Sequence, residues 1–66
     1  MQNYRVYAKF EGQQRFKPMD LSTGQQVTNL IYATIVSESR LWDLKEYLED
    51  VKKDQPELEF KIEKIK

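Results

Sequence analysis

The chain has 66 residues, 33% of them charged, and its 11 basic and 11 acidic side chains balance to a formal net charge of zero. A chain of this length has room for one small core, so we expect residues 1–66 to form a single domain. Because the sequence contains neither cysteine nor histidine, it excludes disulfides, thiolate or imidazole metal ligands, and nucleophilic catalysis of the Ser-His or Cys type.

Size and composition lead to two further expectations. A small domain without disulfides or zinc relies on good packing or on association with another chain, which favours an oligomer. No apolar run approaches the ~20 residues that span a bilayer, and the N-terminus lacks a signal pattern. We therefore expect a cytoplasmic protein that makes no contact with a membrane.

The first part of the chain predicts two strands joined by a turn. Apolar and polar residues alternate from Tyr4 to Phe10, which indicates a strand with one face in water. Gly12 suits the following turn, because glycine adopts positive φ at low cost. We expect a short second strand at Arg15-Phe16-Lys17, which either ends at Pro18 or lies at a sheet edge. A polar loop is expected over residues 20–26.

The most apolar segment runs from Asn29 to Val36 and predicts a third strand. Both of its faces are apolar, with Leu30, Tyr32 and Val36 on one face and Ile31, Ala33 and Ile35 on the other. A strand of this kind is usually central and covered on both sides. The sequence offers one helix for this purpose, so we expect a loop, long side chains or a second copy of the protein to protect the other face.

A helix and a final strand complete the chain. Apolar residues recur at helical spacing at Leu41, Leu44, Leu48 and Val51, while Ser37 or Ser39 suits the start of the helix and Pro56 its end. Leu58, Phe60 and Ile62 then alternate with charged residues. A strand, a helix and a strand in succession imply that the third and fourth strands are parallel. The predicted fold is α+β in the order β-β-β-α-β, a four-stranded mixed sheet with one helix packed on one face.

The sequence offers little for catalysis. Its glycines are isolated, so no phosphate-binding loop is present, and its serines and threonines read as loop and cap residues. Carboxylates line one stripe of the expected helix, namely those of Asp43, Glu46, Asp50 and Asp54. Such a stripe can hold Mg²⁺ or Ca²⁺ or meet a basic partner, but it is more typical of a solvated face. We expect no enzymatic activity, no metal and no cofactor.

Trp42 is the first candidate for a binding residue. It falls almost opposite the stripe centred on Leu44 and Leu48, and tryptophan is enriched in binding hot spots. It either folds onto the loop over residues 20–26 or onto the strand end near the helix start, or it contributes to an interface. The other protein-interface candidates are Ile31, Ala33 and Ile35, on one face of the apolar strand. The leading hypothesis is therefore a non-catalytic interaction module, a homodimer that associates through the uncovered sheet face or a module that binds another protein.

The alternative hypothesis is a nucleic-acid-binding accessory protein. A basic patch with an aromatic residue can form on the first two strands, from Arg5, Tyr7, Lys9, Arg15 and Lys17. Single-stranded nucleic acids bind such sheets by base stacking and phosphate contacts. The zero net charge argues against tight binding of a polyanion.

Several segments carry a resemblance to a group of known proteins. They are Tyr4-Arg5-Val6-Tyr7-Ala8-Lys9-Phe10-Glu11-Gly12, Arg15-Phe16-Lys17-Pro18-Met19-Asp20, Asn29-Leu30-Ile31-Tyr32-Ala33-Thr34 and Leu58-Glu59-Phe60-Lys61-Ile62. Together they resemble short, uncharacterised bacterial proteins of the kind carried on conjugative elements and phages. The resemblance supplies no activity, ligand or site residues, and it implies at most an accessory role on mobile DNA.

Overall fold

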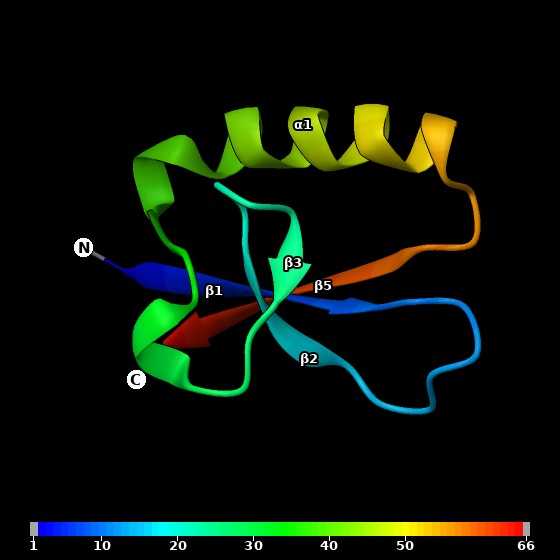
Figure 1. The fold of residues 1–66 in the computed structure, drawn as a ribbon. Helices are drawn as coiled ribbons and strands as arrows, with labels where there is room; N and C mark the ends of the chain where they lie inside the picture. Colours follow the sequence, from blue (N-terminus) through cyan, green and yellow to red (C-terminus); the bar gives the residue numbers. More distant parts are fainter. Residues whose placement is uncertain (1, 66) are drawn as a thin grey trace.

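The computed structural model describes residues 2–65, which form a five-stranded antiparallel sheet with one helix across one of its faces (Figure 1). A 3-10 turn leads directly into this helix. In chain order the elements are β1 (Asn3–Lys9), β2 (Lys17–Asp20), β3 (Gln25–Gln26), η1 (Leu30–Tyr32), β4 (Ile35–Ser37), η2 (Glu38–Arg40), α1 (Leu41–Asp54) and β5 (Glu59–Ile65). The α+β class, the first strand, the helix and the closing strand are confirmed.

β1 is the central strand of the sheet. Along one edge it pairs with β5 over its full length, from Asn3 opposite Ile65 to Lys9 opposite Glu59. Its other edge is shared, because β4 pairs with the first half of β1 and β2 pairs with the second half. β3 extends the sheet beyond β2. All of these pairings are antiparallel.

The expected four-stranded mixed sheet is therefore wrong in strand number and in pairing. β4 and β5, the strands on either side of the helix, do run in the same direction, because each is antiparallel to β1. They are not neighbours, since β1 lies between them. α1 carries the chain across the sheet from one edge of β1 to the other, and the order is β-β-β-β-α-β.

The expected strand from Asn29 to Val36 is also wrong. Its first part is the 3-10 turn η1, because the Asn29 side chain accepts a hydrogen bond from the Ile31 amide at 3.1 Å. Thr34 then fixes the chain against β2, where its amide donates to the Met19 carbonyl at 3.0 Å and its hydroxyl accepts from the Leu21 amide at 2.8 Å. Side-chain hydrogen bonds of this kind compete with strand pairing. Only residues 35–37 join the sheet beside β1.

The turn region contains two smaller corrections. Pro18 lies inside β2, which begins at Lys17, so the expected strand at residues 15–17 is displaced toward the C-terminus. The proline is tolerated because β2 pairs with β1 at only two positions, and its carbonyl still accepts from the Val27 amide at 2.9 Å. The polar loop over residues 20–26 contains the short strand β3.

The core lies between α1 and the sheet. Val6 from β1 is fully buried against Leu44 and Leu48, so the predicted buried stripe of the helix is confirmed. The predicted serine cap is wrong, since the Ser37 side chain makes no capping hydrogen bond and lies 3.1 Å from the Ser39 hydroxyl instead. Seven hydrophobic side chains are buried within residues 2–65, which makes this a thin core.

The opposite face of the sheet is partly covered by the chain itself. The segment that contains η1 passes on the side of the sheet away from α1 (Figure 1). On β1 the side chains that alternate with Val6 and Ala8 are long ones, Arg5, Tyr7 and Lys9, and all three are half-buried. Two of the expected covers, a loop and long side chains, are thus present. Within residues 2–65, no helix has the length and apolar composition that crossing a membrane requires.

Candidate functional site

The largest group of exposed apolar side chains lies on η1 and β4. Leu30 is 43% exposed, Ile31 76%, Tyr32 64% and Ile35 55%. We call these residues the Leu30–Ile35 surface. Three of them share the single turn of η1, which holds their backbone in place through hydrogen bonds from the Tyr32 and Ala33 amides to Asn29 and Leu30.

The segment that forms the Leu30–Ile35 surface contributes no charge to it, although Arg5 of β1 lies opposite Ile35 in the strand register. No acidic or basic residue occurs between Asp20 and Glu38, although one third of the whole chain is charged. Depletion of charge is typical of the core of a protein–protein interface. Ala33, which the sequence also suggests for this contact, is only 7% exposed. Its side chain is therefore buried and is not part of this surface, whereas Tyr32 before it is exposed.

Trp42 lies on the first turn of α1 and is 73% exposed. The interpretation that it folds onto the loop over residues 20–26 is therefore wrong. Its neighbours in a shallow hollow of the helix surface are Lys45, Glu46 and Glu49. α1, which carries Trp42, and η1, which carries Ile31, lie on opposite sides of the sheet (Figure 1), whereas Ile35 on β4 lines a hollow with Asp43 and Leu44 of α1. The structure does not bring these interface candidates together.

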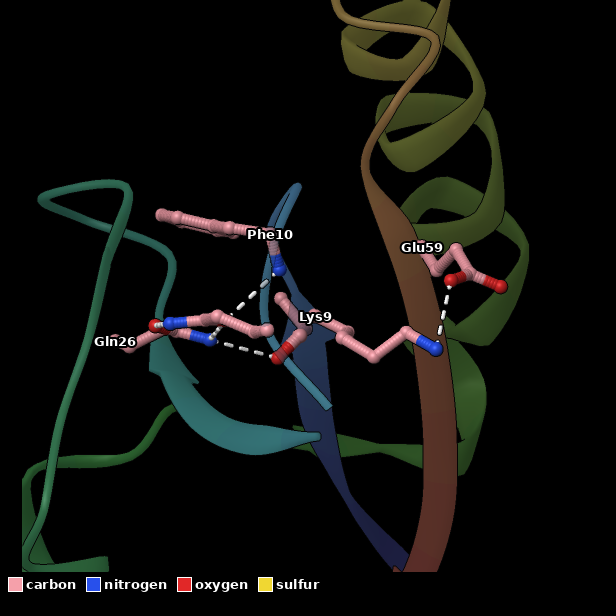
Figure 2. A network of polar contacts seen from close by, with 6 residues as sticks. Lys9, Phe10, Gln26 and Glu59 are labelled. Atoms are coloured by element: carbon pink, nitrogen blue, oxygen red, sulfur yellow. Dashed lines mark hydrogen bonds and ion pairs between the residues drawn. The ribbon is translucent and has the colours of Figure 1, made fainter. Parts of the chain in front are cut away.

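The basic candidates on β1 face carboxylates on β5. Lys9 Nζ lies 2.9 Å from the Glu59 carboxylate (Figure 2), and Lys61 Nζ lies 3.5 Å from that of Glu63. The Phe16 ring supports both cations, with its centroid 5.3 Å from Lys9 Nζ and 5.8 Å from Lys61 Nζ. This end of the open face is therefore a set of compensated charges around an aromatic ring.

The remaining basic candidates do not join that set. Arg15 is exposed in the turn before β2. Lys17 is opposite Ala8 in the strand register, so it points to the side of the sheet that α1 covers, away from Arg5 and Lys9. The basic residues predicted to form one patch are thus divided between two faces.

A glutamine pair that sequence reasoning missed fixes the end of β1. The side-chain amides of Gln13 and Gln26 lie 2.8 Å apart and bond to each other. Gln13 Oε1 also accepts from the Phe10 amide, and Gln26 Nε2 donates to the Ala8 carbonyl, each at 2.8 Å (Figure 2). The pair ties the turn after β1 to β3. Two glutamines in polar loops carry no distinctive signal in the sequence.

Two adjoining hollows run along α1, of about 280 and 360 Å³. Leu21 and Tyr47 line both, and most of the other walls are apolar. The charged residues among these walls are Arg40 and Asp43. The hollows show that α1 covers its sheet loosely on this side, and they contain no arrangement of acid, base and nucleophile.

The carboxyl group of Asp20 is perturbed by hydrogen bonds from a neighbouring serine. The Ser22 hydroxyl donates to its Oδ1 at 2.6 Å and the Ser22 amide at 2.9 Å, and these bonds hold the pKa of Asp20 below its usual value. The carboxylate closes an Asx turn after β2. Among residues 2–65, no three acidic side chains lie close enough together to hold a metal ion, so the acidic stripe of α1 does not converge.

Comparison with protein-family models, with curated proteins and with solved structures found no match to this chain.

Proposed function

We propose that this protein is a non-catalytic interaction module that forms a homodimer through the Leu30–Ile35 surface. The exposure of that surface carries the proposal. Ile31 and Tyr32 are 76% and 64% exposed, side by side on one turn, in a domain that buries few apolar residues. Large exposed apolar side chains grouped on one short segment are typical of a surface that a partner covers.

The composition of the surface favours a second copy as the partner. A two-fold contact brings the same patch of each copy together, so the patch must be complementary to itself. An apolar segment without charged side chains of its own meets that condition, whereas a surface of one charge repels its own copy. The zero net charge of the chain adds no long-range repulsion between copies. The small core gives association a further role in stabilising the fold.

Sedimentation equilibrium over a range of concentrations tests the proposal. We expect the wild-type protein to associate, and Ile31→Asp to shift association to much higher concentration by placing a charge in the contact. Gln14→Asp is the matched control, because Gln14 is exposed in the turn after β1 and the change introduces the same charge. A monomeric wild type, or equal association of wild type and Ile31→Asp, contradicts the proposal.

Nucleic-acid binding remains the second candidate, and the Phe16 ring beneath Lys9 and Lys61 is the feature that favours it. The adjacent carboxylates of Glu59 and Glu63 weigh against it, because they already compensate both cations. Titration of labelled single-stranded oligonucleotides at low and high salt separates the two candidates. Binding that weakens with salt and is lost in Lys9→Ser would favour the nucleic-acid function.

A further inference from the structure

The outer edge of β5 is a second surface available for pairing. β5 is seven residues long, and β1 is its one partner strand within residues 2–65. The strand contains no proline or glycine, and its register with β1 runs without a bulge from Glu59 to Ile65. Proline, glycine and bulges usually block pairing at an edge, and β5 has none of them, so its backbone is suited to bond to another strand. Its charged side chains then decide which register it accepts.

The charges of β5 alternate along one face. Glu59, Lys61 and Glu63 share the face away from α1, because side chains two residues apart point the same way. Lys61 and Glu63 remain about half exposed, at 52% and 48%, although their charged groups are 3.5 Å apart. Both are therefore accessible to a strand that approaches the edge.

We infer that β5 pairs in antiparallel register with β5 of a second copy, about a two-fold axis at Ile62. Ile62 is the central residue of Glu59–Ile65, so this register pairs the whole strand. It places Lys61 opposite Glu63 of the partner subunit, and the symmetry repeats that pair. Opposite charges at facing positions stabilise antiparallel strands.

The neighbouring registers are disfavoured by the same charges. Centring the pair on Lys61 places that lysine opposite its own copy and Glu59 opposite Glu63 of the partner subunit. Centring it on Glu63 places two glutamates face to face. Like charges at facing positions are destabilising. Charged residues at an edge commonly prevent pairing, but the pattern of β5 leaves the full-length register matched.

The helix side of β5 agrees with this register. Ile62 meets Ile62 of the partner subunit at the axis, and Phe60 lies opposite the aliphatic stem of the partner's Lys64. The axis is perpendicular to the sheet, so both α1 helices lie on the same side of one continuous sheet. β5 and the Leu30–Ile35 surface flank opposite edges of β1. The edge contact therefore does not rest on the proposed function, and a chain that uses both contacts assembles beyond a dimer.

A mixing experiment in the Ile31→Asp background tests the edge contact alone. Lys61→Glu and Glu63→Lys each place like charges at both facing pairs, so each variant is expected to dimerise about tenfold more weakly. An equimolar mixture of the two restores opposite charges at both pairs and is expected to recover dimer. Lys45→Glu, the same charge change on an exposed position of α1, is the control and leaves dimerisation unchanged. Circular dichroism confirms that each chain is folded.

A second measurement reports the register directly. The chain has no cysteine of its own, so Ile62→Cys introduces a single thiol that faces its own copy across the axis. We expect it to form an intermolecular disulfide under mild oxidation, and Lys64→Cys, whose thiols are offset along the strands, to form it slowly. Equal rates, or a mixture that does not recover dimer, would overturn the edge contact. The two proposals can fail separately. If Ile31→Asp abolishes association and the charge variants do not change association in the wild-type background, the edge contact is wrong and the proposed homodimer through the Leu30–Ile35 surface stands.

Discussion

Leu48→Ala measures how tightly α1 packs on the sheet. Leu48 is buried against Val6 and Leu44 and also lines the hollow of about 280 Å³. The substitution removes three carbon atoms, which at ~0.8 kcal/mol each gives about 2–3 kcal/mol of lost transfer free energy. We expect the additional cavity term to be small, because the vacated space opens into the hollow and admits water.

Val6→Ala gives the matched comparison. Val6 is fully buried, so the space left by its two lost carbon atoms is enclosed and carries the full cavity term. We therefore expect Val6→Ala to cost as much as Leu48→Ala, although it deletes less. Total stability for a domain of this size is roughly 3–10 kcal/mol, so either change lowers the midpoint of unfolding markedly.

Urea unfolding followed by circular dichroism provides the measurement. It is made in the Ile31→Asp, Lys61→Glu background, in which both proposed contacts are weakened, so that association contributes little to the free energy of unfolding. Glu49→Ala, on the exposed side of the same helix, is the control and should change stability little. A cost near 5 kcal/mol for Leu48→Ala would show that the site is enclosed, and no cost would show that α1 does not pack there.

Two further substitutions and one fluorescence measurement test other features of the molecule. Gly12 has a φ of +87°, and nothing lies within 4 Å of the position that a Cβ would take. Gly12→Ala is therefore expected to lower stability by about 1 kcal/mol through the backbone alone, whereas D-alanine at this position in a synthetic chain should not destabilise the fold. Equal effects of the two substitutions would refute the conformational argument. Ser22→Ala should raise the pKa of Asp20 in an NMR titration. The pKa of Asp20 in the folded protein lies below its value in the unfolded chain, so its contribution to stability is present above the unfolded pKa and is lost as the pH falls through the folded pKa. An unchanged pKa in Ser22→Ala would show that the Ser22 hydroxyl does not lower the pKa. The emission of Trp42, the single tryptophan, should not change on dilution, because neither proposed contact includes it; a shift with concentration would place Trp42 in an interface.

The spacing of apolar residues correctly predicted the first strand and the helix, because each of these elements buries one face in the core. The alternation from Tyr4 to Phe10 and the helical spacing of Leu44 and Leu48 each reflect one buried face, and the structure buries those faces together. The order of the strands in the sheet could not be predicted in this way. A crossover helix fixes that β4 and β5 run the same way, but not that β1 lies between them.

The prediction of a strand from Asn29 to Val36 was wrong because it relied on amino-acid composition and did not consider side-chain hydrogen bonds to the backbone. β-Branched residues favour a strand, yet the Asn29 side chain and the Thr34 hydroxyl bind backbone amides and shape a turn instead. An asparagine two residues before Ile31 was the available signal. Ile31 and Ile35 are exposed, as the sequence suggested, but the structural reason differs. They lie on a turn and on a short strand, and not on one face of a long strand.

Isotope-filtered NMR on a mixture of labelled and unlabelled protein tests the homodimer most directly, because it detects contacts between copies alone. The proposed dimer predicts cross-peaks between the methyl groups of Ile31 or Ile35 in one copy and the Tyr32 ring of the other. The absence of such cross-peaks at concentrations where the protein is associated would contradict it.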